Sequence, residues 1–152
     1  MSDSSATSMP ASRIEGILLT STKAHALAKN IRQAIGLATK TSNKTRLLDE
    51  FCGVALEADR YLMAFESAVQ ELLDEIESDR DEVLQACGRD QYELAIASLD
   101  ALMAIARDGY AITLSIDCRR PIRSLPTLRL ISNYLDLIGA GVEGVIGYFD
   151  GA

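Results

Sequence analysis

Residues 51–76 read FCGVALEADRYLMAFESAVQELLDEI, and their apolar side chains recur at alternating steps of four and three residues. This spacing places one apolar stripe along a helix, the pattern with which antiparallel helices pack side by side. The members of the stripe are Phe51, Ala55, Ala58, Leu62, Phe65, Val69, Leu72 and Ile76. The pattern predicts a long helix, which either continues to Cys87 and ends at Gly88 or breaks near Ser78 and Asp79.

Three other segments carry helical spacing, at about residues 12–39, 90–118 and 127–149. Asp90, followed three residues later by Glu93, predicts a cap at the start of the helix over residues 90–118. Pro121 and Pro126 predict a break before the helix over residues 127–149. The stretch AITLSI at 111–116 continues the helical register. We therefore predict an all-α fold, an antiparallel bundle of four (possibly five) helices. We expect residues 13–150 to form a single domain and residues 1–12 to form a disordered tail.

Composition narrows the class of protein. The chain has 152 residues, of which 48% are hydrophobic and 24% charged, as in folded soluble proteins. Three cysteines form no paired framework, which suits a reducing compartment, and no signal peptide or membrane-spanning run is visible. We expect a cytoplasmic protein. The single histidine, His25, excludes any site that needs two imidazoles, and we expect no metal and no cofactor.

Charge is distributed unevenly along the chain. The balance is +5 over residues 1–46, −13 over 47–117 and +1 over 118–152, which together give the net charge of −7. Such a balance disfavours nucleic acid as a partner, because phosphate contacts need clustered lysine and arginine. The densest acidic stretch, residues 66–82, is either a solvated helix face or a docking surface for a basic partner.

The last two predicted helices have unusually wide apolar arcs. Each carries a second apolar stripe beside its core-facing one, so that the arc covers about 200° at 100° per residue. The second stripes are Leu94, Ala101, Ile105, Ile112 and Ile116 on one helix, and Leu130, Tyr134, Leu137, Gly141, Gly144 and Tyr148 on the other. Either the last helix lies centrally among three neighbours, or apolar surface is left over for a partner.

Four glycines follow one another closely in the last helix, at 139, 141, 144 and 147. Each costs about 1 kcal/mol relative to alanine in a helix interior. The spacing of Ala140 and Gly144 allows close crossing of two helices. We interpret the glycines as sites of close packing; the alternative is a helix that ends near Gly139.

His25 and Cys118 are the residues that suggest chemistry. His25 and Leu27 resemble part of the His-x-Leu-Lys-Gly motif of histidine phosphotransfer domains, although Ala28 and Lys29 stand where that motif has lysine and glycine. The resemblance implies a phosphoryl-accepting imidazole on a four-helix bundle; the alternative is a surface histidine without a role. Cys52 and Cys87 are interpreted as core residues, and Cys118 is the most reactive candidate because of the neighbouring arginines.

We expect a non-enzymatic interaction or assembly protein. It self-associates as a homo-oligomer or docks a protein partner through the second stripes of its two C-terminal helices. The six stripe residues of the last helix are the interface candidates, and no catalytic residue is assigned. The alternative function is a phosphotransfer-type signalling module that uses His25.

Overall fold

The computed structural model describes residues 23–36, 44–117 and 119–150. Residues 23–36 are helical, and four further helices follow: α3 (Lys44–Ser78), α4 (Arg80–Cys87), α5 (Arg89–Thr113) and α6 (Pro121–Asp150). No strand occurs within these ranges, so the predicted all-α bundle is confirmed. The tail predicted at residues 1–12, the two ends predicted for the first helix and Cys118 lie outside the described residues.

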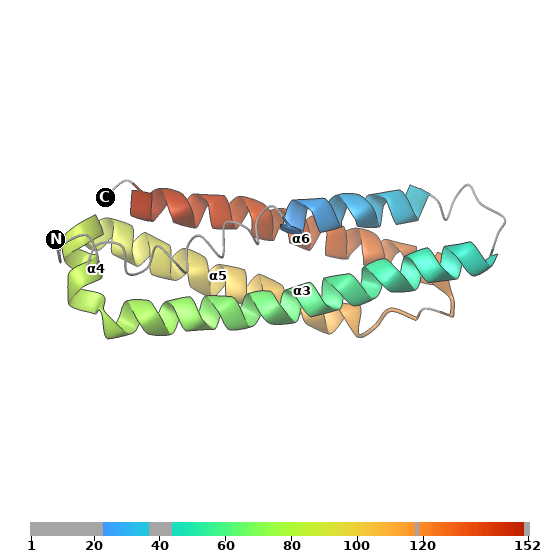
Figure 1. Cartoon of the computed structure of the whole chain (residues 1–152), viewed down its shortest axis with the longest axis horizontal. Coiled ribbons are helices and arrows are strands. Elements are labelled where there is room, and N and C mark those ends of the chain that lie inside the picture. Colours follow the sequence, from blue (N-terminus) through green and yellow to red (C-terminus); the bar gives the residue numbers. More distant parts are fainter. Residues whose placement is uncertain (1–22, 37–43, 118, 151–152) are drawn as a thin grey trace.

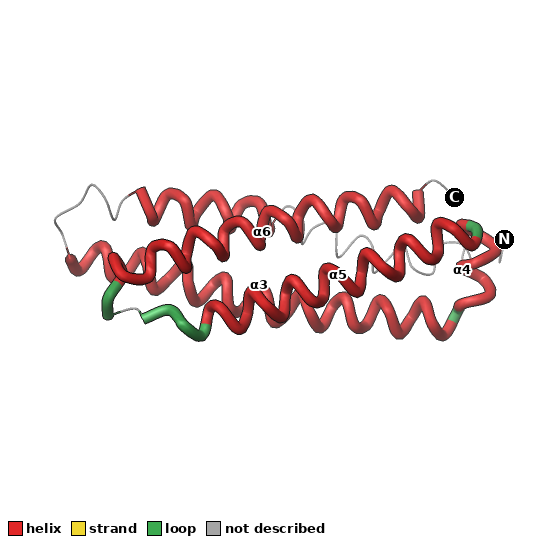
Figure 2. Tube along the Cα trace, turned by 180° about the vertical axis from the view of Figure 1, so that it is seen from behind, coloured by secondary structure: helices red, strands yellow, loops and turns green. Residues whose placement is uncertain are grey.

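The long helices alternate in direction along one axis (Figure 1). α3 and α6 run one way, and α5 and the 23–36 helix run the other way. The most extensive contacts are those of α5 with α6 and of α3 with α5, while α4 crosses one end of the bundle. Figure 2 shows the same arrangement from behind, with short turns between α3 and α4 and between α4 and α5. The 23–36 helix lies beside α6 along one part of the bundle's length.

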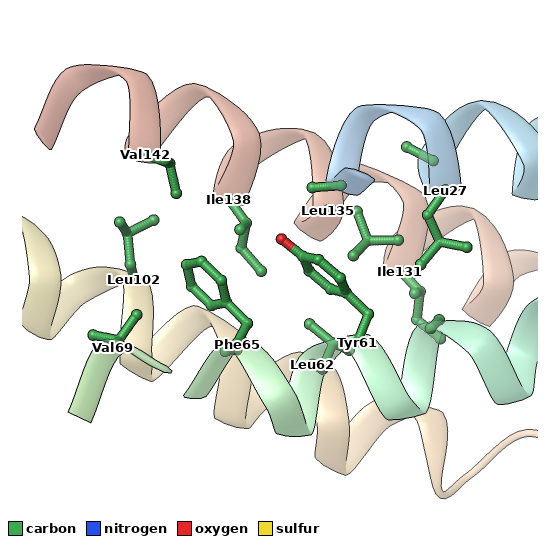
Figure 3. Packing of buried hydrophobic residues seen from close by; sticks show 14 of the residues in the cluster. Leu27, Tyr61, Leu62, Phe65, Val69, Leu102, Ile131, Leu135, Ile138 and Val142 are labelled. Atoms are coloured by element: carbon green, nitrogen blue, oxygen red, sulfur yellow. The ribbon is translucent and has the colours of Figure 1, made fainter. Parts of the chain in front are cut away.

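The core is built from the stripes that the sequence predicts. Phe51, Leu62 and Phe65 of α3 are almost completely buried, as are the core-facing residues of α6. In Figure 3, Tyr61 and Phe65 of α3 point toward Leu135 and Ile138 of α6, and Val69 points toward Leu102 of α5. Burying a large aliphatic or aromatic side chain contributes about 1.5–3 kcal/mol, so these layers hold the helices together.

The long predicted helix breaks near Ser78 and Asp79, which is the second of the two alternatives that the sequence allowed. α3 ends at Ser78 and α4 begins at Arg80, and α4 has only one buried residue, Val83. Gly88 then has φ 85°, a left-handed backbone that glycine adopts without strain. This allows α5 to begin at Arg89. The cap predicted at Asp90 is wrong, because Gly88 occupies the cap position.

The boundaries of α5 and α6 also differ from expectation. α5 ends at Thr113 rather than near residue 118. There the one hydroxyl proton of Thr113 is shared between two acceptors, the carbonyl of Tyr110 (2.5 Å) and Oδ1 of Asp59 in α3 (2.8 Å). The backbone amide of Ser115 then donates to the carbonyl of Ile112 (3.0 Å), which closes a tighter turn after the helix. α6 begins at Pro121 instead of 127. Proline is favourable at the first helical position, where its missing N–H costs nothing.

Candidate functional site

α5 and α6 touch through two glycines. A Cβ atom added to Gly141 would lie 2.5 Å from Cδ2 of Leu102, so α5 fills the space that this glycine leaves. A Cβ on Gly109 would lie 3.3 Å from the ring of Tyr134 and 3.2 Å from Leu62. These contacts fix the line along which the two helices meet. Tyr134 and Gly141, two of the predicted interface residues, therefore serve the internal packing of the chain.

Other members of the second stripes lie on the solvent side of this line, whereas Ile105, Ile112 and Ile116 pack partly against the core and Tyr148 is partly buried. At 100° per residue, Leu137 and Gly144 are displaced by about 40–80° from Tyr134 and Gly141, away from the core. The large apolar side chains there are half exposed: Leu94 by 48%, Leu130 by 42% and Leu137 by 53%. We call this surface the α5–α6 outer face. It consists of Leu94, Ala101, Ile105 and Ile112 of α5 and Leu130, Leu137 and Gly144 of α6, with Ile105 and Ile112 partly buried.

The α6 part of the outer face carries no charge. The exposed residues between its members, Asn133 and Ala140, are neutral, and Asp108 of α5 lies only at its edge. Asp136 and Glu143 turn instead toward the 23–36 helix, where both carboxylates meet His25. On a chain with a net charge of −7, a neutral apolar strip of this kind is a distinct feature of the surface.

The four glycines of α6 fall into two pairs. Gly139 and Gly141 are covered within the chain, because an added Cβ would lie 2.5 Å from the imidazole of His25 or from Leu102. Gly144 and Gly147 are exposed, and nothing lies within 4 Å of an added Cβ. Internal packing thus explains the first pair and leaves the second pair without a partner in the described chain. The alternative of a helix that ends near Gly139 is wrong, since α6 continues to Asp150.

His25 lies between two carboxylates. Its Nδ1 donates to Oδ1 of Asp136 (3.2 Å), and its Nε2 lies 3.7 Å from Oε1 of Glu143. Arg32, two turns further along the same helix, also pairs with Asp136. Partial burial by itself would raise the pKa of Asp136, but the hydrogen bonds and positive charges of Arg32 and His25 outweigh it and hold that pKa below its usual value. These interactions of His25 and Arg32 with Asp136 join the 23–36 helix to α6.

This geometry bears on the phosphotransfer hypothesis. The side chain of His25 is 44% exposed, as an acceptor requires, yet the carboxylate of Glu143 faces Nε2 and would repel an incoming phosphoryl group. Lys29 is exposed on the same helix. Phosphotransfer therefore remains a prediction, with a local charge that opposes it.

The described residues offer little other chemistry. Cys52 and Cys87 are partly buried, and burial raises the pKa of the Cys87 thiol, which donates to the carbonyl of Val83 (3.1 Å). A raised pKa disfavours the nucleophilic thiolate. No group of three or more potential metal-binding side chains comes together within the described ranges. None of the helices described combines the length and apolar content that crossing a membrane requires.

Sequence reasoning did not find the cluster of His25, Arg32, Asp136 and Gly139. Its two halves, one on the 23–36 helix and one on α6, lie more than 100 positions apart, and no local pattern joins them. Comparison with known proteins adds no relative: no family model matches the chain, and neither a curated protein nor a solved structure matches it.

Proposed function

We propose that this chain is a non-enzymatic assembly protein that associates with a second copy of itself through the α5–α6 outer face. The observation that carries the proposal is the coincidence of three half-exposed leucines with an exposed, unfilled glycine, Gly144, on one face. Burial of apolar area is the main favourable term in protein association. The leucines supply such area, and the glycine permits close approach of a second backbone.

The cost of the open glycines supports the same proposal. Gly144 and Gly147 each destabilise the helix by about 1 kcal/mol relative to alanine, and no described part of the chain uses the space that they leave. The α6 helix of a second copy, crossing at Gly144, would occupy this space. The exposed Ala140, four residues earlier, provides the other small position of such a crossing.

Charge favours a second copy as the occupant. Two chains with a net charge of −7 repel each other, so they associate best through a surface that carries none of that charge. In a two-fold symmetric dimer the same face is buried on both subunits. The neutral α6 strip meets this condition, whereas the outer surfaces of α3 and α4 are rich in carboxylates.

The test is the mass of the purified chain, measured by light scattering after size-exclusion chromatography in reductant over a wide range of concentration. We expect a dimer. The double substitution Leu130→Glu with Leu137→Glu should give a monomer of unchanged helix content. The matched control is Leu56→Glu with Met63→Glu, because these α3 residues are also half exposed (48% and 52%) and also seven positions apart. The control should remain a dimer.

A single substitution tests the crossing point. Gly144→Leu should abolish association while the monomer stays helical, since nothing in the described chain obstructs the new side chain. A wild-type chain that is monomeric at every concentration would contradict self-association. Docking of a different protein on this face would then be the remaining form of the hypothesis. Equal loss of the dimer in both double variants would contradict the choice of face.

A further inference from the structure

A groove of about 780 Å³ lies at the corner where α3 turns through α4 into α5. The break at Asp79 makes this corner, because α4 crosses the end of the bundle while the last turns of α3 and the first turns of α5 diverge around it (Figure 1). The apolar lining comes from all three helices: Leu73 of α3, Leu84 of α4, and Tyr92 and Ile96 of α5. Tyr92 is buried and the other three are partly buried, so the groove has an apolar floor.

The rim of the groove is charged and predominantly acidic. Four carboxylates, Asp74, Glu77, Glu93 and Asp100, and two guanidinium groups, Arg80 and Arg89, line it. Arg89 pairs with Glu93 (3.3 Å), and Asp74 accepts a hydrogen bond from Gln70 (3.0 Å). Within the part of the chain that the structure describes, Glu77 and Asp100 make no ion pair. The rim therefore presents two uncommitted carboxylates beside an apolar floor.

The dimensions of the groove suit a helix. The lining residues of α5 extend from Arg89 to Asp100 on one helical face, a length of about 17 Å at 1.5 Å per residue. This is about three helical turns. An amphipathic helix binds such a groove with apolar residues at spacings of three and four positions, and charges on its flanks set its specificity.

We propose that this groove binds an amphipathic helix of another protein, with its apolar residues on Leu73, Leu84 and Ile96 and its lysines or arginines facing Glu77 and Asp100. The groove lies on the opposite flank of α5 from the α5–α6 outer face. The inference is therefore independent of self-association, and a dimer could hold one such helix on each subunit.

The probe is a fluorescent peptide of about four helical turns, built from leucine and lysine as one amphipathic helix, with a second peptide in which glutamate replaces lysine. Fluorescence anisotropy measures binding to the full chain. The lysine peptide should bind and the glutamate peptide should not. Glu77→Lys with Asp100→Lys should weaken binding of the lysine peptide by about tenfold or more, because attraction becomes repulsion at two positions.

Two matched controls separate the groove from general effects. Glu50→Lys with Glu57→Lys makes the same change in net charge on the exposed first half of α3, and should weaken binding by less than about threefold. Leu73→Gln with Ile96→Gln should weaken binding, whereas Leu130→Gln with Leu137→Gln should not. Circular dichroism checks that each variant is folded. Equal weakening by both charge reversals, or no binding of the lysine peptide, would overturn the proposal.

Discussion

The two pairs of glycines in α6 belong to the same helix and the same short stretch, yet they have different environments. Gly139 and Gly141 are covered by His25 and Leu102, so the absence of a side chain lets two other helices approach. No described residue lies within 4 Å of a Cβ atom added to Gly144 or Gly147. Glycine costs the same helix stability at all four positions. Internal packing of the described chain therefore accounts for the first pair and not for the second.

The largest effect should come from filling a covered position. We expect Gly141→Leu to lower the free energy of unfolding by about 1–3 kcal/mol, because the new side chain overlaps Leu102 and forces α5 and α6 apart. Urea denaturation monitored by circular dichroism measures this change. A variant as stable as the wild type would show that the middle of α6 is as open as its end.

A smaller effect of opposite sign is expected at an open position. Gly144→Ala should raise the free energy of unfolding of the monomer by about 0.5–1 kcal/mol, since alanine favours the helix and meets no neighbour. The measurement is made in the monomeric background of Leu130→Glu with Leu137→Glu, so that any loss of association does not obscure it. Destabilisation by alanine would mean that Gly144 is packed after all.

The smallest effect concerns the interactions of Asp136 with Arg32 and His25. Because Arg32 and His25 lower the pKa of Asp136 in the folded chain, this carboxylate stabilises the fold at neutral pH, and the contribution disappears as pH falls through that lowered pKa. We expect Asp136→Asn to be about 0.2–1 kcal/mol less stable at pH 7, the usual value for an exposed ion pair. At pH values well below that lowered pKa the two proteins should converge. Urea titrations at several pH values test this; a difference that does not change with pH would contradict it.

The helices and their core-facing residues could be predicted because each depends on local spacing. Every residue of the α3 stripe from Phe51 to Ile76 is buried in the core of the bundle, as the helical period of the stripe requires. The helix ends were less predictable. At the end of α5 Thr113 contacts Asp59, which lies 54 positions earlier, and the start of α5 depends on the left-handed backbone of Gly88.

The surfaces were predictable only in part. The wide apolar arcs of the last two helices correctly indicated apolar side chains beyond the core, and Leu94, Leu130 and Leu137 are half exposed. The same stripe also contained Tyr134 and Gly141, which pack inside the chain. The sequence period does not separate these groups on α6, because they differ by only about 20–60° around the helix, and the position of α5 decides which side of the line is covered.

The sequence by itself determined that this chain forms long antiparallel helices, because the 3.6-residue period of apolar side chains is a local property of each segment. Only the tertiary structure decided which glycines contact side chains of other helices and which residues of α6 contact His25. It also decided that α3, α4 and α5 line a groove. Each of these depends on side chains from helices far apart in the chain, and their distances are fixed only when the helices pack.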